Sequence, residues 1–499
     1  MTATAPPTAR RPDPPAQSPA PRIARSALAT SGLLTGLDHF HRWFTDAARQ
    51  LAMDVREVPL EELAGWHTDP GTGDLRHDSG RFFSVTGLEV HAPGAPVDRW
   101  RQPVLDQREV GVLGILAKEF DGVLHFLMQA KNEPGNPDGP QLSPTVQATR
   151  SNFTRVHGGT SVPYLGHFLD TSRHQVLADV RQSEQGSWFY HKRNRNMVVL
   201  VEEDVEALDG FCWLTLGQLQ RLLAVDDLVN MDARTVLSCL PFAGDGLSEL
   251  YSVADQDSFA AAVVRSCEPS ATGEQAVRDL LGWLSGIRSV REDDARLVPL
   301  RDVDRWRRAG GRIVHEDGAF FSVMGVSVSA TGREVRSWSQ PLVEPCDEGV
   351  CAFLVRRREG VLQLLVQARA ERGFVDAIEL APTVQCTPSN YDVLPEGARP
   401  PYLTEVLSAR PERIRFDTVL AEEGGRFFRA RNRYLVVEVD EDDRDFGTPR
   451  PGYRWVTMAQ LASLLCHSHY LDVEARSLVA CLHGLSAGLR PDFESTPRS

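Results

Sequence analysis

Two polar segments of this chain have nearly the same sequence and could bind the same kind of ligand. Residues 142–153 read LSPTVQATRSNF, and residues 380–391 read LAPTVQCTPSNY. Hydroxyl, amide and backbone N–H groups, together with Arg150, suit the oxygens of a phosphate or a sugar. The alternative is a turn whose backbone geometry restricts the sequence. Because Pro388 replaces Arg150 in the second copy, the two predicted cradles differ in charge.

Charged residues at the end of a predicted strand form a second candidate. Lys131 and Glu133 follow the strand in the first copy, and Arg369 and Glu371 stand at the matching places in the second. Lys131 could meet a phosphate or a carbonyl oxygen while Glu133 moves a proton. A solvated turn would use the same residue types, so the sequence leaves both interpretations open.

Two further repeated features also have two interpretations each. Tyr164 and Tyr402 follow prolines, where a phenol is either a buried hydrogen-bond donor or an acid. The Arg-Asn-Arg triplets at 193–195 and 431–433 are typical either of a strand edge or of a diphosphate contact.

The tryptophans recur in pairs. Trp43 and Trp283 lie inside helical patterns, which favours a place in the core. Trp66 and Trp306 precede polar segments and are expected near loops. An exposed indole there would stack on a base, which contributes about 1–3 kcal/mol.

All these residues belong to an internal duplication that covers most of the chain. The offset between the copies is 240 at the start, 238 through the long middle section and 242 near the end. Two homologous modules are therefore predicted at 28–245 and 277–488, joined by a polar linker at 246–276. Tails are expected at 1–27, which is rich in Pro, Ala and Arg and should be disordered, and at 489–499.

Each module should place the candidate residues on a mixed sheet. Apolar runs at 111–117 and 123–129 flank an Asp-Gly turn signal, which predicts a β-hairpin. Thr215 is the expected N-cap of a helix at 216–223, and Asp232 is expected to begin a helix that ends at Leu240. Since the helices fall mainly at the start and end of each module, the predicted fold class is α/β, an α+β mixed sheet between helices.

The composition argues against several classes of function. A net charge of -14 and a pI near 5.5 disfavour nucleic acid or an anionic membrane as the main partner. The eight cysteines form no CxxC pair, which is typical of buried thiols in a reducing compartment. The sequence has no apolar run near the roughly 20 residues that span a bilayer. From the thiols and the missing apolar run we expect a cytoplasmic protein. The sequence also has no Walker, GxGxxG, HExxH or GxSxG motif, so we expect a protein that needs no metal and no cofactor.

Several motifs taken together resemble those of the nucleotide-diphosphate hexose 2,3-dehydratases of deoxysugar biosynthesis. They are FFSV, WxQP, QAKNEPGN, LSPTVQATRSNF, the HGG at 157–159, PYL and LAPTVQCTPSNY. The resemblance implies a homodimeric enzyme of two tandem Nudix-like modules, each with a pocket for a dTDP-sugar. The implied substrate is dTDP-4-keto-6-deoxy-D-glucose. The metal-binding helix signature of Nudix hydrolases is missing from both halves, so pyrophosphate hydrolysis is not expected.

The implied reaction is an internal elimination. A C4 ketone acidifies the C3 proton, and loss of the C2 hydroxyl leads to a 3,4-diketo-2,6-dideoxy sugar for antibiotic biosynthesis, which a downstream 3-ketoreductase would use. We expect Glu133 or His157 as the base, Tyr164 as the acid and Lys131 as the enolate partner. The predicted substrate-binding residues are Trp66, Thr149, Arg150, Ser151, Asn152, Phe153, Trp283, Trp306, Arg336, Gln385, Thr387, Pro388, Ser389 and Asn390.

The two predicted pockets are chemically unequal. The first half has Lys131, His157, His191 and Lys192 where the second has Arg369, Pro395, Arg429 and Ala430. We therefore expect a catalytic first pocket and a second that is vestigial or a structural nucleotide site. The competing hypotheses are a non-catalytic nucleotide-sugar binding protein and a magnesium-dependent pyrophosphatase.

Overall fold

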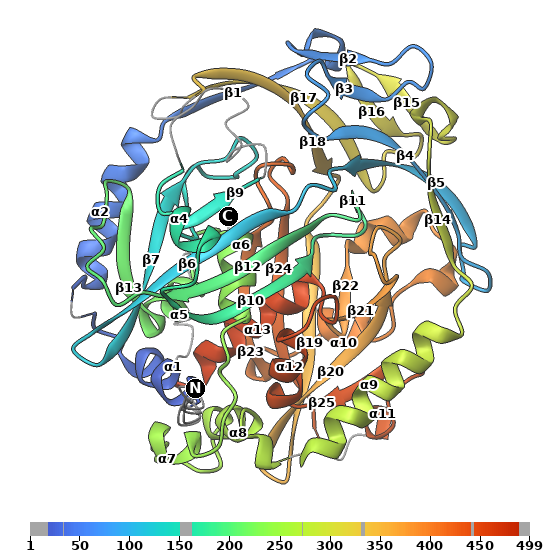
Figure 1. Cartoon of the computed structure of the whole chain (residues 1–499). Coiled ribbons are helices and arrows are strands. Elements are labelled where there is room, and N and C mark those ends of the chain that lie inside the picture. The colour runs from blue at the N-terminus through green and yellow to red at the C-terminus, as the bar shows by residue number, and fades with distance from the viewer. Residues whose placement is uncertain are drawn as a thin grey trace, which may run out of the picture.

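Two large mixed sheets, one from each half of the chain, form the centre of the molecule (Figure 1). The computed structural model describes residues 18–32, 34–149, 162–271, 273–330, 335–440 and 444–488. The first-half sheet contains β6 (Gly111–Phe120), β7 (Val123–Lys131), β8 (Gln141–Ser143), β9 (Val146–Ala148), β10 (Gln175–Ser183), β12 (Arg193–Leu200) and β13 (Phe211–Thr215). The second-half sheet contains β19 (Gly349–Arg358), β20 (Val361–Ala370), β21 (Ile378–Ala381), β22 (Val384–Cys386), β23 (Ile414–Ala421), β24 (Arg431–Glu438) and β25 (Tyr453–Val456).

The predicted hairpin forms in each half, but its two strands separate before they end. β6 pairs with β7 only from Leu116 to Phe120, and beyond that point β9 pairs with β6 while β8 pairs with β7. Thr145 lies at this fork, where its hydroxyl donates to the carbonyl of Leu127 and accepts the N–H of Leu116 at 2.9 Å. Thr383 makes the same two contacts in the second half. The repeated Pro-Thr-Val therefore closes the point where two strands diverge.

Each half contributes a strand to a smaller sheet of the other half. β1 (Met53–Val58) pairs antiparallel with β17 (Phe321–Ala330), and β14 (Asp294–Val298) pairs antiparallel with β4 (Ser84–His91). Figure 1 shows both crossings beside the large sheets. The other strands of these sheets are β2 (Trp66–Thr68), β3 (Leu75–His77), β5 (Arg99–Asp106), β11 (Phe189–Tyr190), β15 (Trp306–Ala309), β16 (Arg312–His315) and β18 (Ser337–Pro345). The two halves are thus interlocked by backbone hydrogen bonds.

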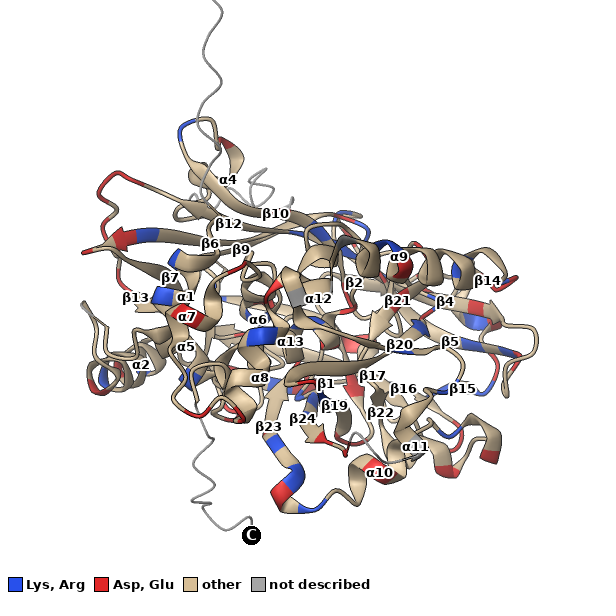
Figure 2. Ribbon diagram, turned by 90° about the horizontal axis from the view of Figure 1, so that it is seen from below, with Lys and Arg blue, Asp and Glu red and all other residues tan. Residues whose placement is uncertain are grey.

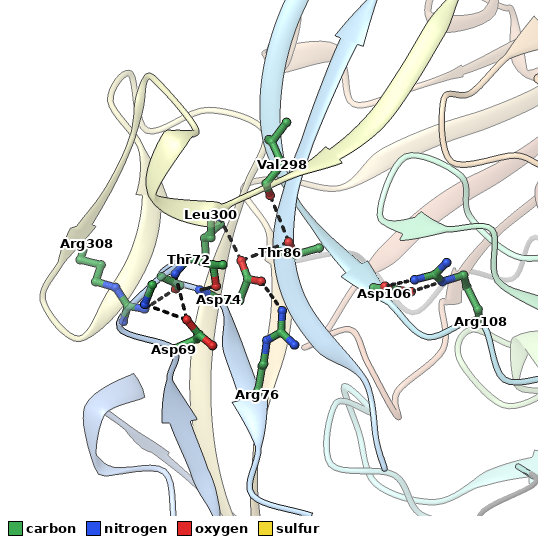
Figure 3. A network of polar contacts seen from close by, with 12 residues as sticks. Asp69, Thr72, Asp74, Arg76, Thr86, Asp106, Arg108, Val298, Leu300 and Arg308 are labelled. Carbon is green, nitrogen blue, oxygen red and sulfur yellow. Dashed lines mark hydrogen bonds and ion pairs between the residues drawn. The ribbon is translucent and has the colours of Figure 1, made fainter. Parts of the chain in front are cut away.

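A buried carboxylate fixes one of these crossings (Figure 3). Asp74, whose side chain is 4% exposed, accepts the N–H of Leu300 at 3.0 Å and the hydroxyl of Thr86 at 3.1 Å, and it also pairs with Arg76 at 2.9 Å. Because Leu300 follows β14, these contacts hold the exchanged strand against β4. A carboxylate buried in this way is stable only while its partners satisfy it.

Side-chain caps set the starts of the helices. α5 (Leu216–Leu222) begins at Thr215, as predicted, because the Thr215 hydroxyl accepts the N–H of Gln218 at 3.2 Å. α6 (Met231–Ser238) begins before the predicted Asp232, because Asn230 supplies the cap to the N–H of Ala233 at 2.8 Å. The other α-helices are α1 (Ala20–Leu28), α2 (Leu37–Gln50), α4 (Gly166–Leu169), α7 (Leu247–Tyr251), α8 (Phe259–Ser266), α9 (Gly273–Ser289), α10 (Leu403–Leu407), α11 (Arg444–Gly447), α12 (Met458–Leu465) and α13 (Val473–Leu485).

Helices α6 and α13 meet at the centre of the molecule, where two fully buried arginines bind the opposite half (Figure 1). Arg234 donates to the carbonyl of Ala421 at 2.9 Å, and Arg476 donates to the carbonyl of Ser183 at 2.6 Å. Each also donates to a carbonyl of its own half, at Val229 and Leu471 respectively. The centre is therefore ordered by charged hydrogen bonds as well as by apolar packing.

The structure places helices in segments that were expected to be tail or linker. α1 includes residues expected in the disordered tail, and α7 and α8 lie within the expected linker. Ser26 donates to the carbonyl of Leu124 at 2.6 Å, and Ser266 donates to the carbonyl of Leu362 at 2.7 Å, so α1 and α8 dock on the two hairpins in the same way. The tail expected at 489–499 lies outside the described residues.

Charged residues of both signs are interspersed along the elements of both halves (Figure 2). Cross-strand pairs account for part of this pattern, such as Arg195 with Asp179 and Arg433 with Asp417. Within the described ranges, no helix is long and apolar enough to cross a membrane. Of the eight cysteines, all of which are free thiols, Cys346 and Cys466 are exposed, contrary to the expectation that they are buried.

Candidate active site

The two cation–carboxylate pairs predicted from the sequence form at the ends of equivalent strands. Lys131 Nζ lies 3.0 Å from Glu133 Oε1 after β7, and Arg369 Nε lies 3.0 Å from Glu371 Oε1 after β20. The side chains of Glu133 and Glu371 are only 14% and 4% exposed. The alternative of a solvated turn therefore does not describe either pair.

A loop from the opposite half covers each pair. Gly135 donates to the carbonyl of Gly424 at 2.7 Å, and Gly373 donates to the carbonyl of Gly186 at 2.9 Å. A Cβ on Gly135 or Gly373 would lie 1.8 Å from a carbonyl oxygen of the opposite loop, so both positions exclude any side chain. Each pair is consequently enclosed by residues of both halves.

Several buried ionisable groups surround Lys131 and Glu133. We call this set the first site; it consists of Lys131, Glu133, Glu184, Lys192, Asp232, Glu423 and Arg426. Glu184, Asp232, Glu423 and Arg426 were not among the residues predicted from the sequence. The repeat could have pointed to Glu184, since it matches Glu422 at the offset of 238 within Glu-x-Gly segments. It could not have pointed to Glu423 and Arg426, whose matching positions hold Gln185 and Trp188.

Burial and mutual repulsion control the carboxyl groups of the first site. Burial, followed by the charge of Glu423, raises the pKa of Glu184 to about 7. The same two causes, with the charge of Glu184, raise the pKa of Asp232 well above its ordinary value. Burial also lowers the pKa of Lys192, although the charges of Glu423 and Glu184 oppose this effect. The first site therefore holds groups that can exchange protons near neutral pH.

Neighbouring amides and carbonyls position these groups. Asn194 donates to Glu184 Oε1 at 2.7 Å and accepts the N–H of Gly111 at 3.1 Å. Lys192 donates to the carbonyl of Glu109 at 2.7 Å. Two residues of the Arg-Asn-Arg triplet therefore make structural contacts: its asparagine orients Glu184, and Arg195 pairs with Asp179.

The corresponding groups of the second half also lie near buried carboxyl groups, because burial and the charge of Glu371 raise the pKa of Asp472 to about 7 and burial raises that of Glu474 well above its ordinary value. We call Arg369, Glu371, Gln185, Glu422 and Gln385 the second site. Gln385 Nε2 lies 3.4 Å from Glu371 Oε1, and Arg369 donates to the Gln385 carbonyl at 2.9 Å. Gln185 donates to Glu422 Oε2 at 2.8 Å. An arginine does not release its proton in proteins, so Arg369 cannot exchange a proton as Lys131 can.

The tryptophans and Arg336 occupy positions outside these two sites. Trp66 donates its indole N–H to the carbonyl of Ser339 at 2.8 Å and packs against Phe83, so it joins the two halves. Trp306 packs against Phe321 in the same core, whereas Trp283 lies on α9 against the central core. Arg336 is exposed in the turn before β18. These contacts favour the core interpretation for the tryptophans.

The signature segments lead from the strand fork toward the sites. Thr149 follows β9, and Thr387 precedes the short 3-10 helix Pro388–Asp392, which includes Ser389. Asn390 accepts the N–H of Phe320 at 2.8 Å. Phe320 has a φ of 68°, a conformation that bulky residues rarely adopt, so Asn390 stabilises a strained position of the FFSV motif. The predicted residues Arg150, Ser151, Asn152, Phe153 and His157 lie outside the described residues.

Tyr164, predicted as an acid, is engaged by backbone groups. Its hydroxyl donates to the carbonyl of Glu206 at 2.7 Å and accepts the N–H of Leu208 at 2.9 Å. Burial also raises its pKa. Tyr402 likewise accepts the N–H of Arg450 at 3.1 Å. These contacts favour the alternative that both tyrosines are hydrogen-bond partners which fix a loop, with Tyr402 buried and Tyr164 half-buried.

One group of residues has donor atoms suited to a metal ion. His167, His174 and Glu203 place one donor atom each within 4.8 Å of one another, next to α4 and the ends of β10 and β12. His167 Nδ1 lies 3.3 Å from His174 Nε2, so the two imidazoles also suit a direct hydrogen bond. None of the three belongs to either site.

The fold and the two sites define a duplicated protein that encloses acid–base groups between interlocked halves. The model of the NDP-hexose 2,3-dehydratase family matches residues 37–240 and again residues 277–482. The chain belongs to this family.

Curated relatives are similar in sequence to this chain over nearly their whole length. Proteins named dTDP-4-dehydro-6-deoxy-alpha-D-glucopyranose 2,3-dehydratase are 48% identical in Saccharopolyspora spinosa, over 93% of this chain and 95% of the relative, and 48% identical in Amycolatopsis orientalis, over 94% of each. A relative of the same name in Streptomyces violaceoruber is 47% identical, over 91% of this chain and 98% of its own length.

Proposed function

We propose that this protein removes the C2 hydroxyl of dTDP-4-keto-6-deoxy-D-glucose and forms dTDP-3,4-diketo-2,6-dideoxy-D-glucose. The observation that carries the proposal is the partly buried Lys131–Glu133 pair within a set of protonatable groups. The names of the relatives support the same reaction. The protein is thus a carbon–oxygen lyase that acts on a nucleotide sugar.

The roles follow from the chemistry of elimination. Glu133 takes the C3 proton, and Lys131, 3.0 Å away, stabilises the enolate that forms on the C4 oxygen. Departure of the C2 hydroxyl as water leaves an enol, which tautomerises to the 3,4-diketone. The first site is catalytic because it combines Lys131 with Lys192 and Glu423, whereas the second site has Arg369, Ala430 and Gln185 at these positions. The second site retains a structural or vestigial nucleotide-binding role.

A mass-spectrometric assay with the 4-keto-6-deoxy sugar tests this function. We expect loss of one water that is unaffected by a chelator. Saturable binding of the sugar without water loss would instead identify a nucleotide-sugar binding protein. Magnesium-dependent release of TMP would identify a pyrophosphatase.

We also propose the next step of the pathway and the assembly of the enzyme. The product is an electrophilic diketone, so a 3-ketoreductase should act next, in a pathway that supplies deoxysugars to an antibiotic. The resemblance also supports Nudix-like modules and a homodimer, and the free thiols suit a cytoplasmic enzyme. Mass measurement of the intact assembly, and detection of the reduced product when a ketoreductase is added, test two of these points.

A further inference from the structure

The two sites differ in one pair of residues that joins the halves. In the second site, Gln185 donates to Glu422 at 2.8 Å, which is a matched amide–carboxylate contact. The corresponding residues of the first site are Glu423 and Glu184, so two carboxyl groups replace that contact. Glu184 Oε2 and Glu423 Oε2 are both buried, and neither accepts a hydrogen bond from the residues that the structure describes. Two ionised carboxylates that are buried close together repel each other, so the pair Glu184 and Glu423 retains a proton.

Glu423 also lies close to Glu133, on either side of Gly425. A Cβ on Gly425 would lie 3.2 Å from Glu423 Oε1 and 3.9 Å from Glu133 Oε2. The position equivalent to Gly425 in the other loop is Ser187, so the loop itself accommodates a side chain. Two carboxyl groups from different halves therefore approach each other beside Gly425.

We propose that Glu423, which comes from the second half, belongs to the first site and holds, together with Glu184, the proton that is delivered to the departing C2 hydroxyl. This inference rests on the proposed function and deepens it. It makes the first site incomplete without the second half of the chain.

Charged groups surround this pair on every side. They are Lys131 and Glu133 after β7, Asp232 on α6, Glu109 before β6, Lys192 before β12, Arg426 in the same loop as Glu423, and Arg476 on α13. The cations lower the pKa of Glu423 and the acids raise it, while burial raises it most.

The proton balance of the step is complete. The pair gives one proton to the C2 oxygen as the C2–O bond breaks, and water leaves. Glu133 holds the proton taken from C3 and returns it to C2 when the enol tautomerises. The proton of the enol hydroxyl, released as the C3 ketone forms, restores the pair. No oxidant or reductant is needed.

Substitution Glu423→Gln tests the proposal. It gives the first site the amide–carboxylate arrangement that the fold already accommodates at Gln185 and Glu422. We expect kcat to fall by about 10²–10⁴-fold with little change in KM. In the pH profile of the residual kcat, the basic limb should lie at lower pH than in the wild type, because Glu184 has lost the neighbouring charge that raises its pKa. Glu423→Asp, which keeps a carboxyl group, should recover part of kcat.

Matched measurements separate the possible outcomes. Thermal unfolding of each variant is recorded. If Glu423→Gln does not fold, kcat and its pH profile are measured for Glu184→Gln instead. A kcat within threefold of the wild type, with unchanged pH limbs, would overturn the inference while the proposed function stands. Absence of water loss in the wild-type protein would refute the proposed function itself.

Discussion

Substituting one glutamate in each half compares the two sites directly, through Glu133→Gln and Glu371→Gln. Both carboxylates lie 3.0 Å from a cation and are at most 14% exposed, so each substitution removes a similar ion pair. With an effective dielectric constant of about 20, such a pair is worth roughly 5 kcal/mol of direct attraction. The desolvation cost of burying the two charges offsets part of this attraction. Breaking a buried pair by removing one partner costs about 3–5 kcal/mol.

Both variants lose a similar ion pair, so a difference between their kcat values reports the catalytic role of the glutamate and not a loss of stability. We expect similar falls in melting temperature, but only Glu133→Gln should lower kcat, by about 10²–10⁴-fold. The assay is the loss of water from the dTDP-sugar, followed by mass spectrometry, with thermal unfolding of both proteins as the control. If Glu371→Gln abolished turnover while Glu133→Gln left it intact, the assignment of the catalytic site would be refuted.

Three further predictions concern the fold. Asp74→Ala leaves the N–H of Leu300 unsatisfied and should lower the free energy of unfolding by about 1–3 kcal/mol, measured by urea denaturation; an unchanged midpoint would contradict the role of Asp74 in holding β14. Thr145→Val and Thr383→Val remove the same strand-fork contacts and should each cost about 1–3 kcal/mol; a cost near zero for both would show that the fork does not need the hydroxyl. Burial raises the pKa of Glu379 to about 8, so its folded form binds a proton more tightly than its unfolded form, and stability should fall as pH rises from about 4.5 to about 8. Glu379→Gln, which copies Gln141 at the equivalent position, should flatten this part of a melting-temperature profile, and an unaltered slope would assign the dependence to other groups.

The sequence predicted local structure well because local structure depends on nearby residues. The hairpin followed from its turn signal, and the Thr215 cap followed from a single side chain next to a helical pattern. The start of α6 was misplaced because Asn230 and Asp232 are both good caps, and only the contact with Ala233 decides between them.

The site was only partly predictable because part of it comes from the other half of the chain. Lys131 and Glu133 are close in sequence, so their pairing could be expected. Glu423 lies near them through the interlocked loops, a proximity that no local pattern encodes. Tyr164 shows the converse case, because a phenol at a repeated position proved to be bound by loop backbone.

The exchange of β1 and β14 has a consequence for how the two halves can change over time. The reciprocal pairing is the arrangement that two identical chains with swapped strands would have, and in such a pair every substitution appears twice. Joining both copies in one chain removes that restriction. A residue such as Glu423 can then differ from its counterpart Gln185, and one site can specialise while the other keeps supporting it.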